Sequence, residues 1–165
     1  MLYIFDLDDT LISSYMRNPG RVYDEWHVLP RRRERLAELL QEGHTIGIAT
    51  NQAGVAFGHV TEVQVEAKIA AALLALGLPE DTPYEACYGH ERGRLKEYRG
   101  KPRIICRKPS GHMIRELMAR FPQATATGVV YVGDRPEDQA AAEDAGVQFR
   151  WAEDFFAEPM TLDAG

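Results

Sequence analysis

The sequence predicts an α/β fold in which a parallel sheet is covered by helices on both faces. Short apolar runs alternate with amphipathic segments along the 165 residues, and several of these runs end abruptly in carboxylates, hydroxyls or amides. Alternating strands and helices are typical of a parallel sheet with helical crossovers. The length suits a single compact domain over residues 1–165.

The first apolar run, Leu2–Phe5, predicts a buried central strand. It is followed by Asp6, Asp8, Asp9 and Thr10. Ligands of open α/β sheets bind outside the carboxyl ends of strands, and the period of two places Asp6 and Asp8 on one side. Two such carboxylates favour a Mg²⁺ ion and phosphate chemistry. An ordinary Asp-rich turn with a helix cap is the alternative interpretation.

Residues 12–29 have the composition of a loop that covers the end of the first strand. A helix is expected over Arg31–Gln41, and its three leading arginines indicate either a solvated surface or a contact with a polyanion. Thr45–Ala49 predicts a second strand, which ends at Thr50 and Asn51. A hydroxyl, an amide and backbone N–H groups together favour anion binding.

The longest helix is expected over Val60–Leu76. A segment rich in glycine, aromatics and positive charge follows over residues 84–107, and within it Ile104–Cys106 predicts a short extended piece that leads to Arg107 and Lys108. The remaining elements are expected in order as a helix from a Ser110 cap to Phe121, a strand over 128–132, a helix over 137–145, a strand over 147–151 and a poorly ordered tail from about residue 157.

The composition excludes several classes of protein. A net charge of −6 argues against a broad nucleic-acid surface, although it does not exclude a local basic groove. The chain has no apolar run near the length of a membrane span and no signal-type start, so we expect a cytoplasmic protein, a monomer or weak homodimer, without a membrane partner. Its two cysteines are too few for a disulfide framework.

Four polar groups follow the expected strands or extended segments in order. They are Asp6-x-Asp8-x-Thr10, Thr50-Asn51, Lys108, and Gly133-Asp134 with Asp138. Together they supply a nucleophile, an acid/base, phosphate-binding groups and metal ligands. This set and its order resemble the haloacid dehalogenase (HAD) superfamily of phosphohydrolases, which implies a HAD-like Rossmannoid three-layer sandwich with a minimal cap.

Two of the motifs resemble one branch of that superfamily. Residues 50–55 and 106–109 are similar to subclass IIIA, the small-cap branch. It contains histidinol-phosphate phosphatase, heptose bisphosphate phosphatase and the 3′-phosphatase domain of polynucleotide kinase-phosphatase. The open site of this branch would admit a sugar phosphate or a nucleic-acid end.

The resemblance implies a role for each residue of the reacting centre. Asp6 would attack phosphorus and form an aspartyl-phosphate, while Asp8 protonates the leaving alcohol and then activates water. Thr50 and Lys108 would bind the phosphoryl group, with the backbone around Asn51 assisting.

The implied Mg²⁺ site comprises Asp134, Asp6 and a backbone carbonyl. That carbonyl is expected from Leu7, or from Asp8 if the register of the loop shifts. Asp138 would support Lys108 or the metal, and Thr10 would support the loop geometry. Arg107 is expected either to determine specificity or to act as a second phosphate-steering charge.

Two departures from the family pattern stand out. Asp9 occupies a position where family phosphatases commonly have glycine, which brings the conformation of the loop into question. Some relatives hold a structural zinc with three Cys and one His, and here Cys87, His90 and Cys106 offer three ligands, which water or His112 would have to complete. Because structural zinc needs four ligands, we expect this site to be degenerate and empty.

The sequence therefore predicts a Mg²⁺-dependent phosphomonoesterase that acts on a small sugar or polyol phosphate. A polynucleotide 3′-phosphatase is the alternative, motivated by Arg31–Arg33, the basic segment 92–101 and an open site. A non-catalytic phospholigand-binding protein is a second alternative.

Overall fold

A single parallel sheet organises the chain. The structure is a computed structural model that describes residues 1–100, 104–125 and 128–159. Its five strands lie in the order β3-β2-β1-β4-β5 and comprise β1 (Leu2–Phe5), β2 (Thr45–Asn51), β3 (Tyr84–Cys87), β4 (Val129–Gly133) and β5 (Gln148–Trp151). The direction of winding reverses between β1 and β4, so the carboxyl ends of these two strands form the crevice where such sheets bind ligands.

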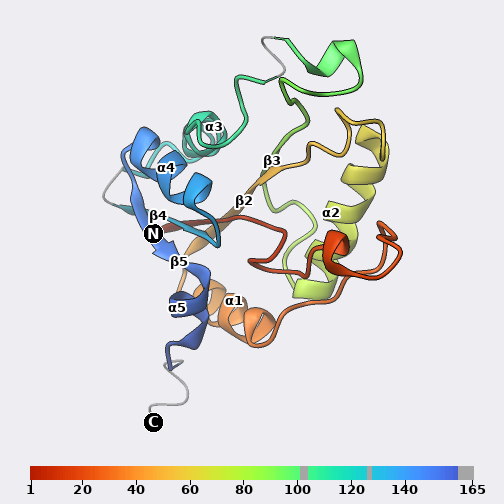
Figure 1. The fold of residues 1–165 in the computed structure, drawn as a ribbon. Coiled ribbons are helices and arrows are strands. Elements are labelled where there is room, and N and C mark those ends of the chain that lie inside the picture. Colours follow the sequence, from red (N-terminus) through yellow and green to blue (C-terminus); the bar gives the residue numbers. More distant parts are fainter. Residues whose placement is uncertain (101–103, 126–127, 160–165) are drawn as a thin grey trace.

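Helices cover both faces of the sheet, as the sequence predicts (Figure 1). One face carries α3 (His112–Ala119) and α4 (Pro136–Ala145), and the other carries α1 (Arg32–Gln41), α2 (Glu62–Leu76) and α5 (Ala152–Ala157). Two short 3₁₀ helices, η1 (Tyr15–Arg17) and η2 (Lys96–Tyr98), lie in the connections. The three-layer α/β sandwich is therefore confirmed.

Strand β1 separates two apolar cores. Leu2 and Ile4 pack with α3 and α4, whereas Phe5 and the following Leu7 pack with α1, α2 and α5. All four side chains are at most 2% exposed. Burial on both faces anchors the end of β1, and with it the residue that follows, Asp6.

The segment before Lys108 differs from the prediction. The prediction of an extended segment at Ile104–Cys106 is wrong, because these residues form a turn in which Arg107 N donates to Ile104 O at 3.1 Å. The strand of this region is instead β3, Tyr84–Cys87, whose residues Tyr84, Ala86 and Cys87 pack against the two cores. The sequence did not predict this strand because polar residues surround it and it forms no clear apolar run.

The C-terminal segment contains an element that the sequence analysis did not predict. Helix α5 buries Phe155 and Phe156 against Phe5 of β1, with ring centroids 5.7 Å and 5.9 Å from that of Phe5. The tail expected to be poorly ordered falls mostly on residues 160–165, outside the described residues. Among the described helices, none combines the length and apolarity that a membrane span requires.

Helices α3 and α4 approach each other closely at Gly111. A Cβ on this residue would lie 2.8 Å from the backbone nitrogen of Ala145 and 2.9 Å from the carbonyl oxygen of Ala141. Backbone atoms cannot yield as a flexible side chain does, so we expect Gly111→Ala to lower the free energy of unfolding by about 1–3 kcal/mol. Urea unfolding would measure the loss. Gly100→Ala is the control, since nothing lies within 4 Å of a Cβ there, and equal unfolding midpoints for the two variants would contradict the prediction.

Candidate active site

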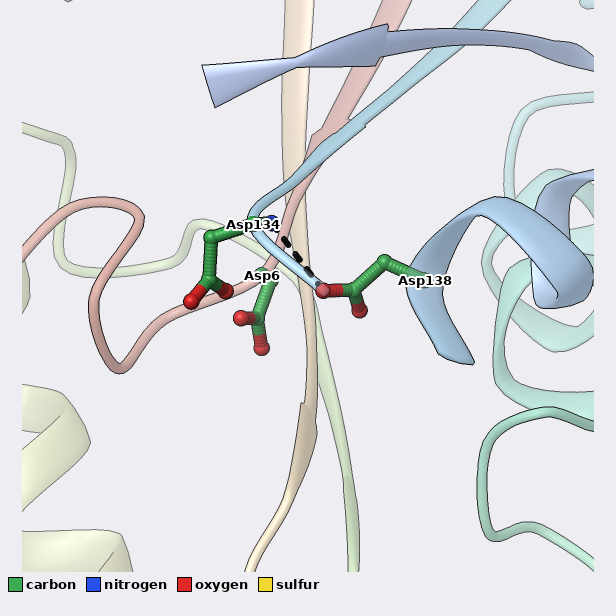
Figure 2. A group of neighbouring side chains, drawn as sticks. All are labelled: Asp6, Asp134 and Asp138. Carbon is green, nitrogen blue, oxygen red and sulfur yellow. Dashed lines mark hydrogen bonds between the residues drawn. The ribbon is translucent and has the colours of Figure 1, made fainter. Parts of the chain in front are cut away.

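Three carboxylates converge where β1 and β4 end (Figure 2). The parallel register pairs Phe5 with Val132, and the Asp6 backbone N–H continues it by donating to Val132 O at 3.0 Å. Asp6 therefore lies beside the exit of β4, where Asp134 follows. Asp6, Asp134 and Asp138 each place a carboxylate oxygen within 4.8 Å of the others. The sequence prediction that these strand ends meet is borne out by the geometry.

Lys108 places a buried ammonium among these groups. Its Nζ lies 2.8 Å from Asp6 Oδ1, 2.7 Å from Asp138 Oδ1 and 2.8 Å from the Tyr131 hydroxyl. Burial disfavours its charge, but Asp6 and Asp138 outweigh burial and raise the pKa of Lys108 above its ordinary value. The lysine therefore stays charged beside the expected nucleophile.

Asp138 supports Lys108 from the first turn of α4. Its Oδ1 accepts from Lys108 and from the Tyr131 hydroxyl, and its Oδ2 accepts from the backbone N–H groups of Asp134 and Arg135, both at 3.1 Å. Because these four donors occupy its oxygens, Asp138 is better suited to hold Lys108 than to bind a metal. A Cβ on Gly133 would lie 2.4 Å from Asp138 Cβ, so the glycine makes room for this carboxylate.

Asp6 is buried and has a strongly shifted pKa. Burial raises the pKa of the Asp6 carboxyl well above its usual range, and Lys108 opposes this shift. Further positive charge beside Asp6 would favour the ionised form of this buried carboxyl group. Burial and the neighbouring carboxylates likewise raise the pKa of Tyr131, so its hydroxyl keeps its proton and donates to Asp138.

Asp6 and Asp134 suit a hard divalent cation. Their oxygens converge, and the Thr10 hydroxyl lies between them, 3.3 Å from Asp6 Oδ2 and 3.2 Å from Asp134 Oδ1. Its one hydrogen can serve only one carboxylate at a time. Oxygen ligands from two carboxylates are those that Mg²⁺ prefers. Thr10 therefore lies in direct contact with both expected metal ligands.

The structure also bears on the expected backbone ligand. The carbonyl of Leu7 accepts hydrogen bonds from the backbone N–H groups of Thr10, Leu11 and Ile12, at 3.3, 2.9 and 3.2 Å. It therefore points into the turn of the loop. This favours the alternative of the sequence analysis, in which the backbone carbonyl of Asp8 completes the metal site.

Asp8 lines the same cavity as Lys108 but has different partners. Gln52 Nε2 donates to its Oδ2 at 3.0 Å, and Lys68 Nζ lies 3.0 Å from its Oδ1. The two aspartates expected to play different roles are thus held by different side chains. Sequence reasoning missed Gln52, Lys68 and Tyr131 as site residues.

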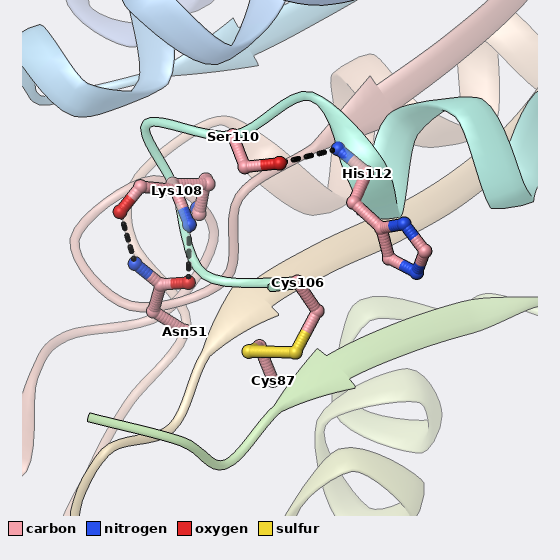
Figure 3. Close-up of a disulfide and its surroundings, with 6 residues drawn as sticks. All are labelled: Asn51, Cys87, Cys106, Lys108, Ser110 and His112. Carbon is pink, nitrogen blue, oxygen red and sulfur yellow. Dashed lines mark hydrogen bonds between the residues drawn. A yellow bond between two sulfur atoms is a disulfide. The ribbon is translucent and has the colours of Figure 1, made fainter. Parts of the chain in front are cut away.

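Thr50 and Asn51 occupy the end of β2 but have different contacts. Thr50 is buried, and its Oγ1 accepts from Gln52 Nε2 at 2.9 Å, which leaves its own hydrogen to donate. Asn51 holds the backbone of Lys108 from both sides, since its Oδ1 accepts from Lys108 N at 3.0 Å and its Nδ2 donates to Lys108 O at 3.4 Å (Figure 3). The Asn51 side chain thus positions Lys108, while its role in phosphate binding stays a prediction.

A cavity of about 540 Å³ opens above Asp6, Asp8 and Lys108. Arg107 lines it, and the Nη1 atom of this arginine is buried without a hydrogen-bond partner among the described residues. Burial lowers the pKa of the guanidinium, which nonetheless remains charged near neutral pH because its ordinary value is so high. A guanidinium group that lines a cavity suits an anionic or hydroxyl-rich ligand.

The backbone conformation at Asp9 explains why the family pattern has glycine at this position. Its φ of 63° lies in the left-handed region, which glycine adopts without strain and aspartate tolerates. Its side chain accepts from Ser14 N at 3.2 Å and from Arg17 Nε at 3.1 Å. Asp9 therefore secures the covering loop, and its carboxylate is engaged there.

The two cysteines form a disulfide, contrary to the expectation drawn from their small number. Cys87 at the end of β3 is joined to Cys106, two residues before Lys108 (Figure 3). His90 Nδ1 accepts from Arg92 N at 3.0 Å. Because the disulfide leaves no thiolate at this place, the Cys87, His90 and Cys106 set does not suit zinc.

The arginines at the start of α1 contact the protein itself. Arg31 donates to the carbonyl of Glu158, Arg32 to that of Thr10 and Arg33 to that of Ala75. The Arg32 guanidinium also lies 4.2 Å from the centroid of the Phe156 ring. These contacts explain the arginines by packing and favour the surface interpretation over a polyanion contact.

Comparisons with known proteins agree with this geometry. The family model described as polynucleotide kinase 3 phosphatase matches residues 1–162. The D-glycero-beta-D-manno-heptose-1,7-bisphosphate 7-phosphatase of Bordetella bronchiseptica is 31% identical over 151 residues, which cover 88% of this chain and 76% of that enzyme. The enzyme of the same name from Pseudomonas putida is 32% identical over 131 residues, with coverage of 78% and 69%.

Solved structures show the same fold. D,D-heptose 1,7-bisphosphate phosphatase from B. bronchiseptica, complexed with magnesium and phosphate, superposes with a TM-score of 0.68 at 29% identity over 90% of this chain and 78% of that chain. A HAD-like structure from Mesorhizobium loti has a TM-score of 0.72 at 24% identity, with coverage of 88% and 68%. The second likeness concerns the fold alone.

The carboxylate pair at the ends of β1 and β4 predicts how Mg²⁺ binding responds to substitution. We expect Asp134→Asn to weaken Mg²⁺ binding by about tenfold or more, because it removes an anionic ligand. Isothermal titration with Mg²⁺ would measure the affinity. Asp9→Asn is the matched control, since Asp9 contacts Ser14 and Arg17 and asparagine tolerates its φ. Equal losses in both variants would show that the acidic loop binds Mg²⁺ without a defined site.

Proposed function

We infer the function from the family, since the chain belongs to the polynucleotide kinase 3 phosphatase family, in the small-cap branch of the HAD phosphatases, and is a phosphoric monoester hydrolase. We propose that it hydrolyses a small sugar or polyol phosphate through an aspartyl-phosphate on Asp6. The observation that carries the mechanism is the cavity that Asp6 and Asp8 both line, in which Lys108 contacts Asp6 and Gln52 contacts Asp8. The substrate class rests on the relatives and on Arg107.

The first step is the attack of Asp6 on phosphorus. A carboxylate oxygen of Asp6 forms a bond to phosphorus as the bond to the ester oxygen breaks. The Lys108 ammonium and the Thr50 hydroxyl would stabilise the charge on the phosphoryl oxygens. Bound Mg²⁺ would be held by Asp6, Asp134 and a backbone carbonyl, and would supply positive charge to these oxygens and to Asp6.

Asp8 would move the protons. In its protonated form it gives its proton to the departing oxygen, so that an alcohol leaves. The resulting carboxylate then takes a proton from water, which attacks phosphorus, breaks the acyl-phosphate bond and releases inorganic phosphate. Asp6 is regenerated as a carboxylate and Asp8 as an acid, so the cycle closes.

The nucleophile has a direct test. We expect Asp6→Asn to lower kcat for p-nitrophenyl phosphate with Mg²⁺ by roughly a thousandfold or more, because the amide cannot attack phosphorus. Steady-state kinetics would measure this, and acid quenching of the unmodified enzyme should trap phosphate on the peptide that contains Asp6. Asp81→Asn, at an exposed surface position, is the control. Retention of most activity in Asp6→Asn would refute the assignment.

A polynucleotide 3′-phosphatase remains the second candidate. The name of the family model supports it, and that model matches nearly the whole chain. The net charge of −6 and the intramolecular contacts of Arg31, Arg32 and Arg33 speak for a small substrate instead. Turnover of a 3′-phosphorylated oligonucleotide would favour the second candidate, especially if kcat/KM fell steeply as the salt concentration rose.

A variant of Arg107 provides a further test of the substrate class. The Arg107 guanidinium lines the cavity, so it should bind a charged or polar group of the substrate away from the reacting phosphate. A charge-assisted hydrogen bond is worth about 1.5–3 kcal/mol, so we expect Arg107→Met to raise KM for D-glycero-β-D-manno-heptose 1,7-bisphosphate by roughly tenfold or more.

The kinetics of the same variants provide the controls. KM for p-nitrophenyl phosphate, which lacks a second charged group, should stay within about twofold in Arg107→Met. Arg94→Met changes an exposed arginine of the basic segment and should leave both values unchanged. If Arg94→Met instead impairs turnover of the oligonucleotide while heptose bisphosphate is not hydrolysed, the sugar-phosphate proposal is wrong.

A further inference from the structure

A second buried lysine contacts the site from helix α2. The Lys68 side chain is 0% exposed, and its Nζ lies 3.0 Å from Asp8 Oδ1. It occupies the apolar face of the helix, three residues after Val65 and four before Ala72, both of which are fully buried. A charged residue on such a face is costly unless a partner compensates it. Asp8 is that partner.

The two oxygens of Asp8 have donors from different elements. Lys68 holds Oδ1 from α2, while Gln52, just after β2, donates to Oδ2 at 3.0 Å. Gln52 Nε2 is itself tied to Thr50 Oγ1 at 2.9 Å. One donor on each oxygen fixes the plane of the carboxyl group, which a single contact would leave able to rotate.

Lys68 also contacts the loop that covers the site. Its Nζ lies 4.5 Å from the centroid of the Tyr23 ring and 5.2 Å from that of Tyr15. The two rings pack edge to face at 5.0 Å, and both line the cavity. A cation against aromatic faces is attractive, more so when it is removed from water. The ammonium thus joins Asp8, α2 and the covering loop.

We propose that Lys68 is a positioning residue for the proton-transfer step: together with Gln52 it orients the Asp8 carboxyl toward the oxygen that leaves phosphorus, and it holds Tyr15 and Tyr23 beside that oxygen. This inference rests on the proposed role of Asp8. A group that gives a proton in one step and takes one in the next must keep its alignment through both. The Asp8 side chain is 26% exposed, so it is accessible from the cavity and needs such support.

The test compares two aryl phosphates that differ mainly in the leaving group. Phenyl phosphate releases the more basic oxygen and needs protonation more than p-nitrophenyl phosphate does, so misalignment of Asp8 should affect it more. We expect Lys68→Met to lower kcat/KM for phenyl phosphate by about tenfold more than for p-nitrophenyl phosphate. Lys68→Gln, which retains an N–H donor, should show a smaller difference. Lys96→Met, at an exposed site on η2, should show none.

A double-mutant cycle distinguishes positioning from structural support. In an Asp8→Asn background, Lys68→Met should change the ratio of the two kcat/KM values by less than about twofold, because its effect passes through Asp8. A loss of folded protein would lower both values equally, and circular dichroism would detect it. If Lys68→Met cannot be folded, the Gln variant in the same cycle decides.

The outcomes separate the inference from the proposed function. The ratio to follow is kcat/KM for p-nitrophenyl phosphate divided by kcat/KM for phenyl phosphate. If Asp8→Asn alone leaves this ratio unchanged, the role of Asp8 as acid is wrong, and the proposed role of Lys68 is wrong with it. If Asp8→Asn raises the ratio but neither Lys68 variant does, the acid role stands and the positioning role of Lys68 is overturned.

Discussion

The buried ammonium of Lys108 is the interaction on which the site depends. It contacts Asp6, Asp138 and Tyr131 within 2.8 Å, and these three residues come from the end of β1, the start of α4 and the middle of β4. Without a cation between them, Asp6 and Asp138 would repel each other in a poorly hydrated interior. Lys108 therefore links the folding of the sheet to the placement of the proposed nucleophile, Asp6.

The chain restrains Lys108 from several directions. Asn51 holds its backbone on one side, and the disulfide between Cys87 and Cys106 ties the preceding turn to the edge of β3. Beyond it, Gly111 allows α3 to approach α4 closely. The residues around Lys108 form turns, which place a side chain less firmly than a strand does. These contacts compensate for that weakness.

The predictable part of the structure is the part encoded by local patterns. Strong apolar runs identified β1, β2 and β4, and the polar residues directly after them identified Asp6, Thr50 and Asp134. Strand β3 was missed because Glu85 interrupts its apolar residues, which are mostly only partly buried, and because its segment is rich in polar residues. The pairing of Cys87 with Cys106 was missed because it depends on the distance between β3 and a turn, which no local pattern contains.

The residues that sequence reasoning missed share one property: each supports another side chain. Tyr131 looks like one more residue of a buried strand until Asp138 and Lys108 are seen against its hydroxyl. Lys68 left a weak signal, a charge within the apolar stripe of α2, which indicates a buried partner without naming it. Such roles depend on tertiary contacts, so they become visible only in the folded chain.

The charges of the site then follow a simple balance. Once Asp8 has given up its proton, Asp6, Asp8, Asp134 and Asp138 are four carboxylates, of which Lys108 and Lys68 neutralise two. The remaining two charges match one divalent cation at the convergent oxygens of Asp6 and Asp134. Arg107 lines the same cavity but contacts none of these four carboxylates among the interactions of the described residues. If the proposed role of Arg107 is right, the selectivity of this enzyme depends on the residue next to the lysine that organises its site.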